Sequence, residues 1–129
     1  MPALLAALAD RPTLLLATPG HAAAQLGAVF GPSLRRGTLR GVALPWLTQS
    51  DYDHLLWASD LNLVRGEDSF VRAQWAARPF VWQLYPQHDG AHLVKLAAFL
   101  ERHLAAATAP LAGACRALWT AWNLSLIHI

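Results

Sequence analysis

The chain of 129 residues has a single cysteine, Cys115, and few charged residues. One thiol excludes a framework of intrachain disulfides and a zinc site built from several cysteines. Charged residues make up 14% of the chain and hydrophobic residues 55%, which excludes intrinsic disorder. The net charge of +2 is too small and too scattered to indicate nucleic-acid binding. The composition therefore indicates one globular domain at most, in which Cys115 is expected to be a buried, inert thiol.

Long hydrophobic runs are also absent. No uninterrupted apolar stretch reaches the roughly 20 residues that span a bilayer, since Pro12, Pro19, Gly20 and His21 interrupt the best candidates. Residues 1–10 are apolar but carry no basic leader, so we do not expect a signal peptide. These features predict a cytoplasmic protein that does not enter a membrane.

Isoleucine occurs only at Ile127 and Ile129, in a chain rich in alanine, leucine and arginine. The run from Leu124 to Ile129 back-translates to CTG TCT CTT ATA CAC ATC, which is the end of a common transposase sequencing adapter. We therefore expect residues 124–129 to be a sequencing artefact and assign no function to His128. The domain is expected to cover residues 1–123 and to be truncated at one or both ends.

Short apolar runs alternate with helical patterns along the chain. Strands are predicted at residues 13–18, 39–44, 61–64 and 80–85. Helices are predicted at residues 3–9, 21–30, 51–59, 69–78, 91–107 and 111–122. This alternation predicts an α/β fold, a Rossmann-like parallel sheet flanked by helices with right-handed crossovers. Ligands of such sheets bind beyond the carboxyl ends of the strands, so function is sought there.

The segment from Arg65 to Ser69 follows one predicted strand and opens a predicted helix. Backbone N–H groups at a helix start favour a phosphate, and Gly66 permits both a tight turn and a close ligand. Ser69 can add a hydroxyl donor, and Arg65 can balance negative charge. The carboxylates that lie between them, at positions 67 and 68, can cap the helix, hold Arg65 or accept hydrogen bonds from sugar hydroxyls. An ordinary capped helix start with a solvated ion pair is the alternative.

Two histidines follow the last predicted strand. His88 and His92 are four residues apart with Asp89 between them, a spacing that superficially suggests a metal site. Residues 86–90 read as a turn, so the histidines need not share a helix face. Roles at the surface or in support of other residues are therefore favoured over a metal.

Other polar and aromatic residues have structural explanations. Asp51, Asp53 and His54 share one short helix, where a cap from Asp51 or Ser50 and a solvated face are favoured over acid–base chemistry. Tryptophans in predicted helices and strands are expected to pack in the core: Trp57, Trp75 and Trp82.

Five segments together resemble a known family. They are LPWL at 44–47, DYDHLLW at 51–57, DLNLVRGEDSFVRAQWA at 60–76, RPFVWQLYPQ at 78–87 and AHLVKL at 91–96. They are similar to the bacterial protein-arginine rhamnosyltransferases that modify elongation factor P. The resemblance is dense over residues 41–100 and loose on both sides, and a match this long is unlike a lone glycine-rich motif.

The resemblance implies a fold and a reaction. These enzymes have two Rossmann-like halves that face a cleft, an arrangement called GT-B. They transfer rhamnose from TDP-β-L-rhamnose to an arginine of elongation factor P with inversion at the anomeric carbon, and they need no metal or other cofactor. This chain resembles the C-terminal half, which binds the nucleotide sugar.

The resemblance also implies roles for individual residues. Glu67 and Asp68 would be the catalytic residues of this half and would contact the diphosphate and rhamnose together with Ser69. The substrate-binding residues would include Arg65 and Gly66 beside them, with Tyr85 at the diphosphate and Trp46 and Gln49 at the thymine base.

The missing half limits what the chain can do. An arginine guanidinium is protonated in water, so its attack needs a carboxylate base in a shielded cleft. In the family, aspartates of the N-terminal half supply this base. We therefore expect the chain to bind the donor without transferring rhamnose. The alternatives are a GT-B transferase domain for another nucleotide sugar and a non-catalytic nucleotide-binding or docking module.

Overall fold

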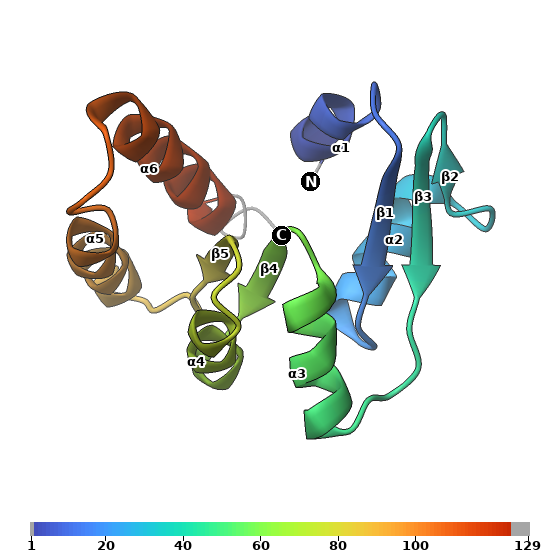
Figure 1. The fold of residues 1–129 in the computed structure, drawn as a ribbon, viewed down its shortest axis with the longest axis horizontal. Helices are drawn as coiled ribbons and strands as arrows, with labels where there is room; N and C mark the ends of the chain where they lie inside the picture. Colours follow the sequence, from blue (N-terminus) through green and yellow to red (C-terminus); the bar gives the residue numbers. More distant parts are fainter. Residues whose placement is uncertain (1, 125–129) are drawn as a thin grey trace. The chain divides into compact units, whose positions relative to one another are not determined.

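The structure is a computed structural model that describes residues 2–124 (Figure 1). The chain divides into two compact units, one up to Asp51 and the other from Tyr52 onward. None of the helices in the described part of the chain is long and apolar enough to cross a membrane.

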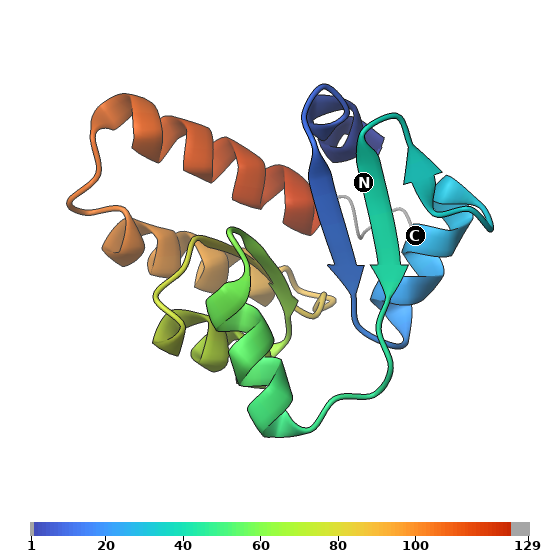
Figure 2. The same ribbon diagram turned by 45° about the vertical axis from the view of Figure 1, so that its right-hand side comes forward.

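The first unit is a small mixed sheet with helices. It contains α1 (Pro2–Leu8), β1 (Thr13–Ala17), α2 (His21–Phe30), β2 (Arg35–Arg36) and β3 (Leu39–Ala43). β1 runs parallel to β3, as Figure 2 shows. Thr13 lies opposite Leu39, and Ala17 lies opposite Ala43. α2 packs closely on β3, because a Cβ atom added at Gly41 would lie 2.9 Å from the Leu26 side chain.

The strand β2 was not predicted. Its two residues pair antiparallel with β3, with Arg36 opposite Leu39, so Gly37 and Thr38 form the turn of a hairpin. Gly37 has a φ of +61°, which the turns that match strand twist require at this position. A strand of two exposed arginines carries no apolar alternation, so the sequence pattern does not reveal it.

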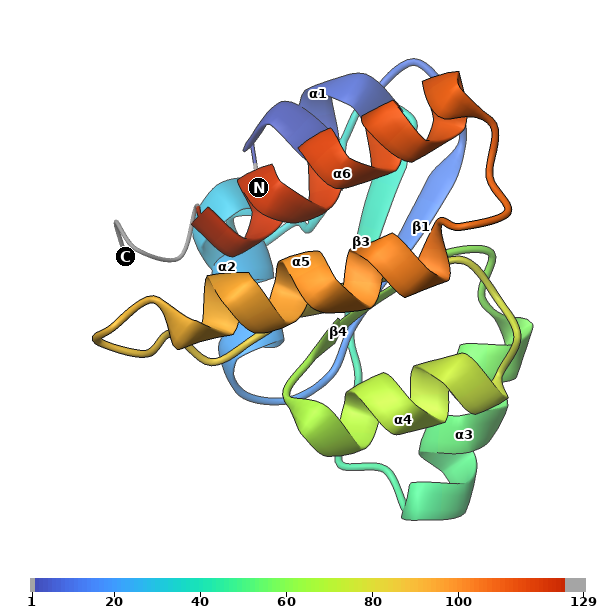
Figure 3. The ribbon, with the colours of Figure 1, turned by 90° about the vertical axis from the view of Figure 1, so that its left-hand side faces the viewer.

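The second unit contains the remaining strands and most of the helices. Its elements are α3 (Gln49–Ala58, which begins in the first unit), β4 (Asn62–Arg65), α4 (Glu67–Trp75), β5 (Phe80–Gln83), α5 (Ala91–His103) and α6 (Ala109–Leu124). β4 runs parallel to β5, with Asn62 opposite Phe80 and Arg65 opposite Gln83. Figure 3 views this unit with α5 in front of β4.

Aromatic rings fill the core of the second unit. Trp82 is 1% exposed and stacks on Phe70 with ring centroids 3.8 Å apart. Phe99 of α5 meets the edge of Phe70 at 4.8 Å and lies nearly parallel to Trp119 of α6 at 5.7 Å. Rings from β5, α4, α5 and α6 therefore hold these elements together.

The prediction that three tryptophans are core residues is wrong for two of them. Trp82 is buried, whereas Trp57 is 50% exposed and Trp75 is 72% exposed. Both exposed rings lie at the ends of short helices, where one face turns to solvent. Cys115 was predicted to be buried, but it is only partly buried against the core.

A buried amide ties α6 to β5. Asn123 is 1% exposed, and its Nδ2 donates to the carbonyl oxygens of Trp82 at 2.9 Å and Trp119 at 2.8 Å. Its Oδ1 accepts a hydrogen bond from the Leu84 N–H at 2.9 Å. The amide therefore satisfies backbone groups at the end of β5 that no neighbouring strand pairs within the described residues.

The predicted fold class is confirmed as α/β with parallel strands flanked by helices. All four predicted strands and all six predicted helices are present, with ends that shift by up to a few residues. The strands form two separate sheets in the described residues, β1-β3-β2 and β4-β5, where one sheet was predicted. The domain limits of 1–123 remain a prediction, and in the artefact prediction for 124–129 only Leu124 is among the described residues.

We predict that Asn123→Leu destabilises the chain by about 2–4 kcal/mol, because it leaves buried N–H and C=O groups without partners. Chemical denaturation followed by circular dichroism measures the change in the free energy of unfolding. Thr120→Ala, at an exposed position of the same helix, serves as the control and is expected to shift it by less than about 0.5 kcal/mol. Equal effects of the two substitutions would contradict the structural role of Asn123.

Candidate functional site

The turn from β4 into α4 is anchored to β5 at Gly66. Its N–H donates to the Gln83 carbonyl at 3.1 Å, which continues the pairing of β4 and β5 by one residue. Its carbonyl oxygen accepts a hydrogen bond from the Trp82 indole Nε1 at 2.9 Å. Two bonds to neighbouring residues of β5 therefore fix the backbone at the carboxyl ends of both strands.

Gly66 also provides the space in which Tyr85 lies. Its φ is +81°, and a Cβ atom added there would lie 2.9 Å from the Tyr85 hydroxyl oxygen. The Arg65 guanidinium carbon lies 5.1 Å from the centroid of the same ring, within the range of a cation–π contact. The structure thus brings together three of the predicted substrate-binding residues, Arg65, Gly66 and Tyr85.

The N-terminus of α4 has no side-chain cap, because its N-cap residue is Gly66. Phe70 N–H donates to the Gly66 carbonyl at 3.3 Å, which leaves the N–H groups before it at the open end of the helix. Among the described residues, the nearby Ser69 hydroxyl makes no hydrogen bond to the protein. Unpaired donors and the positive end of the helix dipole favour an anion here.

The two carboxylates of the first turn have cationic partners. Glu67 forms an ion pair with Lys95 of α5. Asp68 accepts a hydrogen bond from Arg72 Nε at 3.2 Å, one turn along α4. The options of capping the helix and of holding Arg65 are therefore wrong, and contacts with a sugar stay a prediction.

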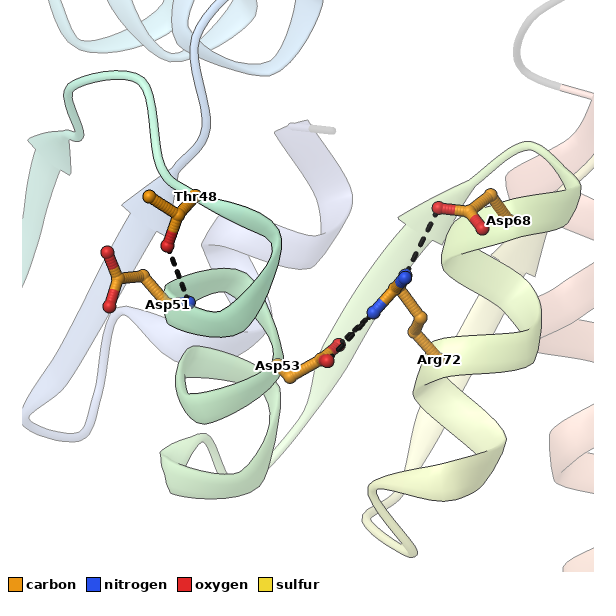
Figure 4. Close-up of polar contacts among 5 residues, drawn as sticks. All are labelled: Thr48, Asp51, Asp53, Asp68 and Arg72. Carbon is orange, nitrogen blue, oxygen red and sulfur yellow. Dashed lines mark hydrogen bonds and ion pairs between the residues drawn. The ribbon is translucent and has the colours of Figure 1, made fainter.

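Arg72 joins α4 to α3, as Figure 4 shows. Its Nη1 donates to both carboxylate oxygens of Asp53, at 2.8 and 2.7 Å. These hydrogen bonds, with that to Asp68, raise the pKa of Arg72 above its ordinary value, although burial opposes the shift. The favoured interpretation of Asp53 as part of a solvated face was wrong, because its carboxylate is only 28% exposed and is paired.

The guanidinium of Arg65 is not paired with Glu67 or Asp68, so it is available to an anionic ligand. Among the described residues, Arg65 has no carboxylate partner, and its guanidinium lies over the face of the Tyr85 ring. Its guanidinium keeps its donors free for a phosphate or carboxylate ligand. The site therefore combines a free guanidinium, an uncapped helix start and a hydroxyl, all suited to an anionic group.

The two residues predicted for the base site belong to the first unit. Trp46 is 85% exposed, and Gln49 is the first residue of α3. The Thr48 hydroxyl accepts the hydrogen bond from the Asp51 N–H at 3.1 Å, so Thr48 caps α3 (Figure 4). The prediction of a cap from Ser50 or Asp51 was wrong because the helix begins earlier than expected. A role for Trp46 and Gln49 at a base remains a prediction.

The histidines after β5 have different surroundings. His92 is buried, and its Nδ1 accepts a hydrogen bond from the Gln87 N–H at 3.0 Å, whereas His88 is exposed. His92 therefore supports the turn that follows Tyr85. No group of three or more candidate metal ligands occurs within residues 2–124.

Lys95, for which the sequence pattern predicts no role, forms an ion pair with Glu67 in the structure. The available signal was its rarity, since Lys95 is the only lysine of the chain. The ion pair could not be predicted, because Lys95 on α5 is distant in sequence from Glu67. The spacing of residues along the chain does not reveal which helices lie side by side.

Comparison with known proteins identifies the family. The model of the elongation factor P rhamnosyltransferase family, EarP, matches residues 1–128. The chain therefore belongs to the EarP family, as its resemblance predicted.

Curated relatives and a solved structure agree with this assignment. A protein-arginine rhamnosyltransferase of Pseudomonas aeruginosa is 48% identical over 122 residues, which cover 89% of this chain and 32% of that protein. A protein of the same name from Shewanella oneidensis is 54% identical over 70 residues, or 54% of this chain and 18% of that protein. The chain thus spans about a third of the length of the longer-matching relative and corresponds to its C-terminal region.

The solved structure concerns EarP-mediated arginine glycosylation of translation elongation factor EF-P. It matches with a TM-score of 0.81 and 39% identity, over 94% of this chain and 41% of the other. The α/β fold of this chain is therefore the same as the fold of that solved structure over the matched region.

We predict that Gly66→Ala destabilises the chain by about 1–3 kcal/mol and displaces the Tyr85 ring, since it adds both backbone strain and a clash. Gly90→Ala is the matched control, because Gly90 has a φ of +71° but nothing within 4 Å of an added Cβ. Denaturation midpoints and the Tyr85 ring signals in NMR spectra measure both effects. Unmoved Tyr85 signals in Gly66→Ala would contradict the close packing.

Proposed function

We propose that this chain is the donor-binding, C-terminal part of an inverting protein-arginine rhamnosyltransferase. Its substrate would be TDP-β-L-rhamnose. One observation carries the proposal: the uncapped start of α4 lies next to Arg65, a guanidinium with no carboxylate partner among the described residues. Membership of the EarP family supports the choice of a nucleotide sugar as the anion.

The diphosphate of the donor would occupy the N-terminus of α4. Arg65, the Ser69 hydroxyl and the N–H groups of the first turn would bind its oxygens, and the Tyr85 hydroxyl would reach it from above Gly66. These donors would stabilise the charge of the leaving diphosphate with one cationic side chain, two hydroxyls and backbone N–H groups, so the proposal includes no metal or other cofactor.

The two acids would act on the sugar. Glu67 and Asp68 lie in the first turn of α4, where the rhamnose attached to the diphosphate would come within reach. Carboxylates there can accept hydrogen bonds from sugar hydroxyls and stabilise positive charge that develops at the anomeric carbon. Trp46 and Gln49 would complete the donor site at the thymine base, by stacking and hydrogen bonding.

The acceptor would be an arginine of elongation factor P. A guanidinium nitrogen would attack the anomeric carbon, the bond from that carbon to the diphosphate oxygen would break, and TDP would leave. The proton of the guanidinium would pass to a carboxylate base in the N-terminal half of the enzyme. The reaction would take place in the cytoplasm, where elongation factors act.

We predict that the chain binds TDP-β-L-rhamnose and TDP more tightly than UDP, with amide shifts in NMR spectra at residues 65–69 and at Tyr85. Arg65→Met is expected to weaken TDP binding about tenfold, because a charge-assisted contact to phosphate is lost. Arg102→Met removes the same charge from an exposed position of α5 and is the control.

Other outcomes of this titration would favour the alternatives. Saturation by UDP at lower concentrations than TDP would indicate a transferase for a different nucleotide sugar. Well-dispersed spectra that respond to none of the three ligands would contradict an autonomous donor site and favour a docking module.

We also predict that the purified chain does not transfer rhamnose to elongation factor P, because the proposed base lies outside it. Mass spectrometry of elongation factor P after incubation with the chain and TDP-β-L-rhamnose measures the transfer. A gain in mass corresponding to one rhamnose would refute the assignment of the base to the other half.

A further inference from the structure

The only lysine of the chain lies at the candidate site. Lys95 projects from α5 and forms an ion pair with Glu67 in the first turn of α4. Its Nζ also lies 5.7 Å from the centroid of the Trp82 ring, within the range of a cation–π contact. Trp82 is itself held by its hydrogen bond to Gly66, so one residue positions both the turn and the ammonium group.

The ion pair addresses an electrostatic conflict in the proposed donor site. A carboxylate in the first turn of α4 repels a diphosphate at the same helix end. Asp68 shares Arg72 with Asp53, but Glu67 has Lys95 as its single cationic partner among the described residues. Without Lys95, Glu67 would present an uncompensated negative charge to the ligand.

We propose that Lys95 is a positioning residue of the donor site, which acts through Glu67. Its ammonium group pairs with the Glu67 carboxylate and weakens the repulsion between that carboxylate and the diphosphate, so that the N–H groups of α4 and the Arg65 guanidinium remain open to the diphosphate. This inference rests on the proposed function, and it adds a residue that touches no donor atom.

The first test is a double-mutant cycle on TDP binding, followed by calorimetry or NMR titration. Lys95→Met is expected to weaken binding about three- to tenfold, Lys95→Arg to retain it, and Arg102→Met to leave it unchanged. In the Glu67→Gln background, Lys95→Met is expected to have no further effect, because the charge that it compensates is gone. A loss that persists in that background would overturn the positioning role and indicate direct contact with phosphate.

The second test reports on the pair without any ligand. Reductive methylation with ¹³C-formaldehyde labels the side chain of Lys95, which is the single lysine, in addition to the N-terminal amine, and it preserves the positive charge. The Lys95 methyl signal is expected to move in Glu67→Gln and to stay in place in Glu101→Gln, an exposed carboxylate on the same helix.

The two tests separate failure of this inference from failure of the proposed function. If the chain binds TDP but the Lys95 methyl signal does not shift in Glu67→Gln, the role of Lys95 is overturned and the proposed donor site is retained. A chain that shows the pair but binds no TDP would overturn the donor site, and with it any role of Lys95 there. Spectral dispersion of each variant verifies that it is folded.

Discussion

The candidate site depends on the attachment of Gly66 to β5. The backbone of this residue donates to Gln83 and accepts from the Trp82 indole, so the direction in which the chain leaves β4 is determined by the neighbouring strand. The start of α4, the position of Tyr85 and the cation–π contacts of Arg65 and Lys95 all follow from that attachment. Because the Trp82 ring also stacks on Phe70 in the core, the geometry of the surface site is coupled to packing of the interior.

Each carboxylate in the first turn of α4 has a cationic partner among the described residues. Lys95 pairs with Glu67, and Asp68 shares Arg72 with Asp53. Arg65 is left to an aromatic face, which holds a guanidinium without using its hydrogen-bond donors. Because Glu67 and Asp68 have cationic partners, the start of α4 remains suitable for an anion although it carries two carboxylates. The sequence alone does not reveal these partners.

The order of strands and helices could be predicted from the sequence. The contacts between distant segments could not, because they depend on how the helices pack. Short apolar strands ended by Gly or Pro indicated the α/β order. A helix after β4 was predicted from Ser69, and α4 begins two residues earlier, at Glu67. The hairpin strand at Arg35–Arg36 has no apolar pattern, and the exposure of Trp57 and Trp75 depends on helix orientation. The pairing of Glu67 with Lys95 depends on how α4 and α5 pack, and this information is not local to either segment.

The hydrogen bonds of Asn123 set a minimum length for a working polypeptide. This residue lies close to the end of α6, yet its amide completes the backbone at Trp82 and Leu84, on either side of the residue that anchors Gly66. A translation product that ended at Trp122, one residue before Asn123, would contain every residue of the candidate site. It would still lack the hydrogen bonds of Asn123 that support the backbone of that site. In this chain, a premature stop codon just before Asn123 is therefore expected to impair the site without removing any of its side chains.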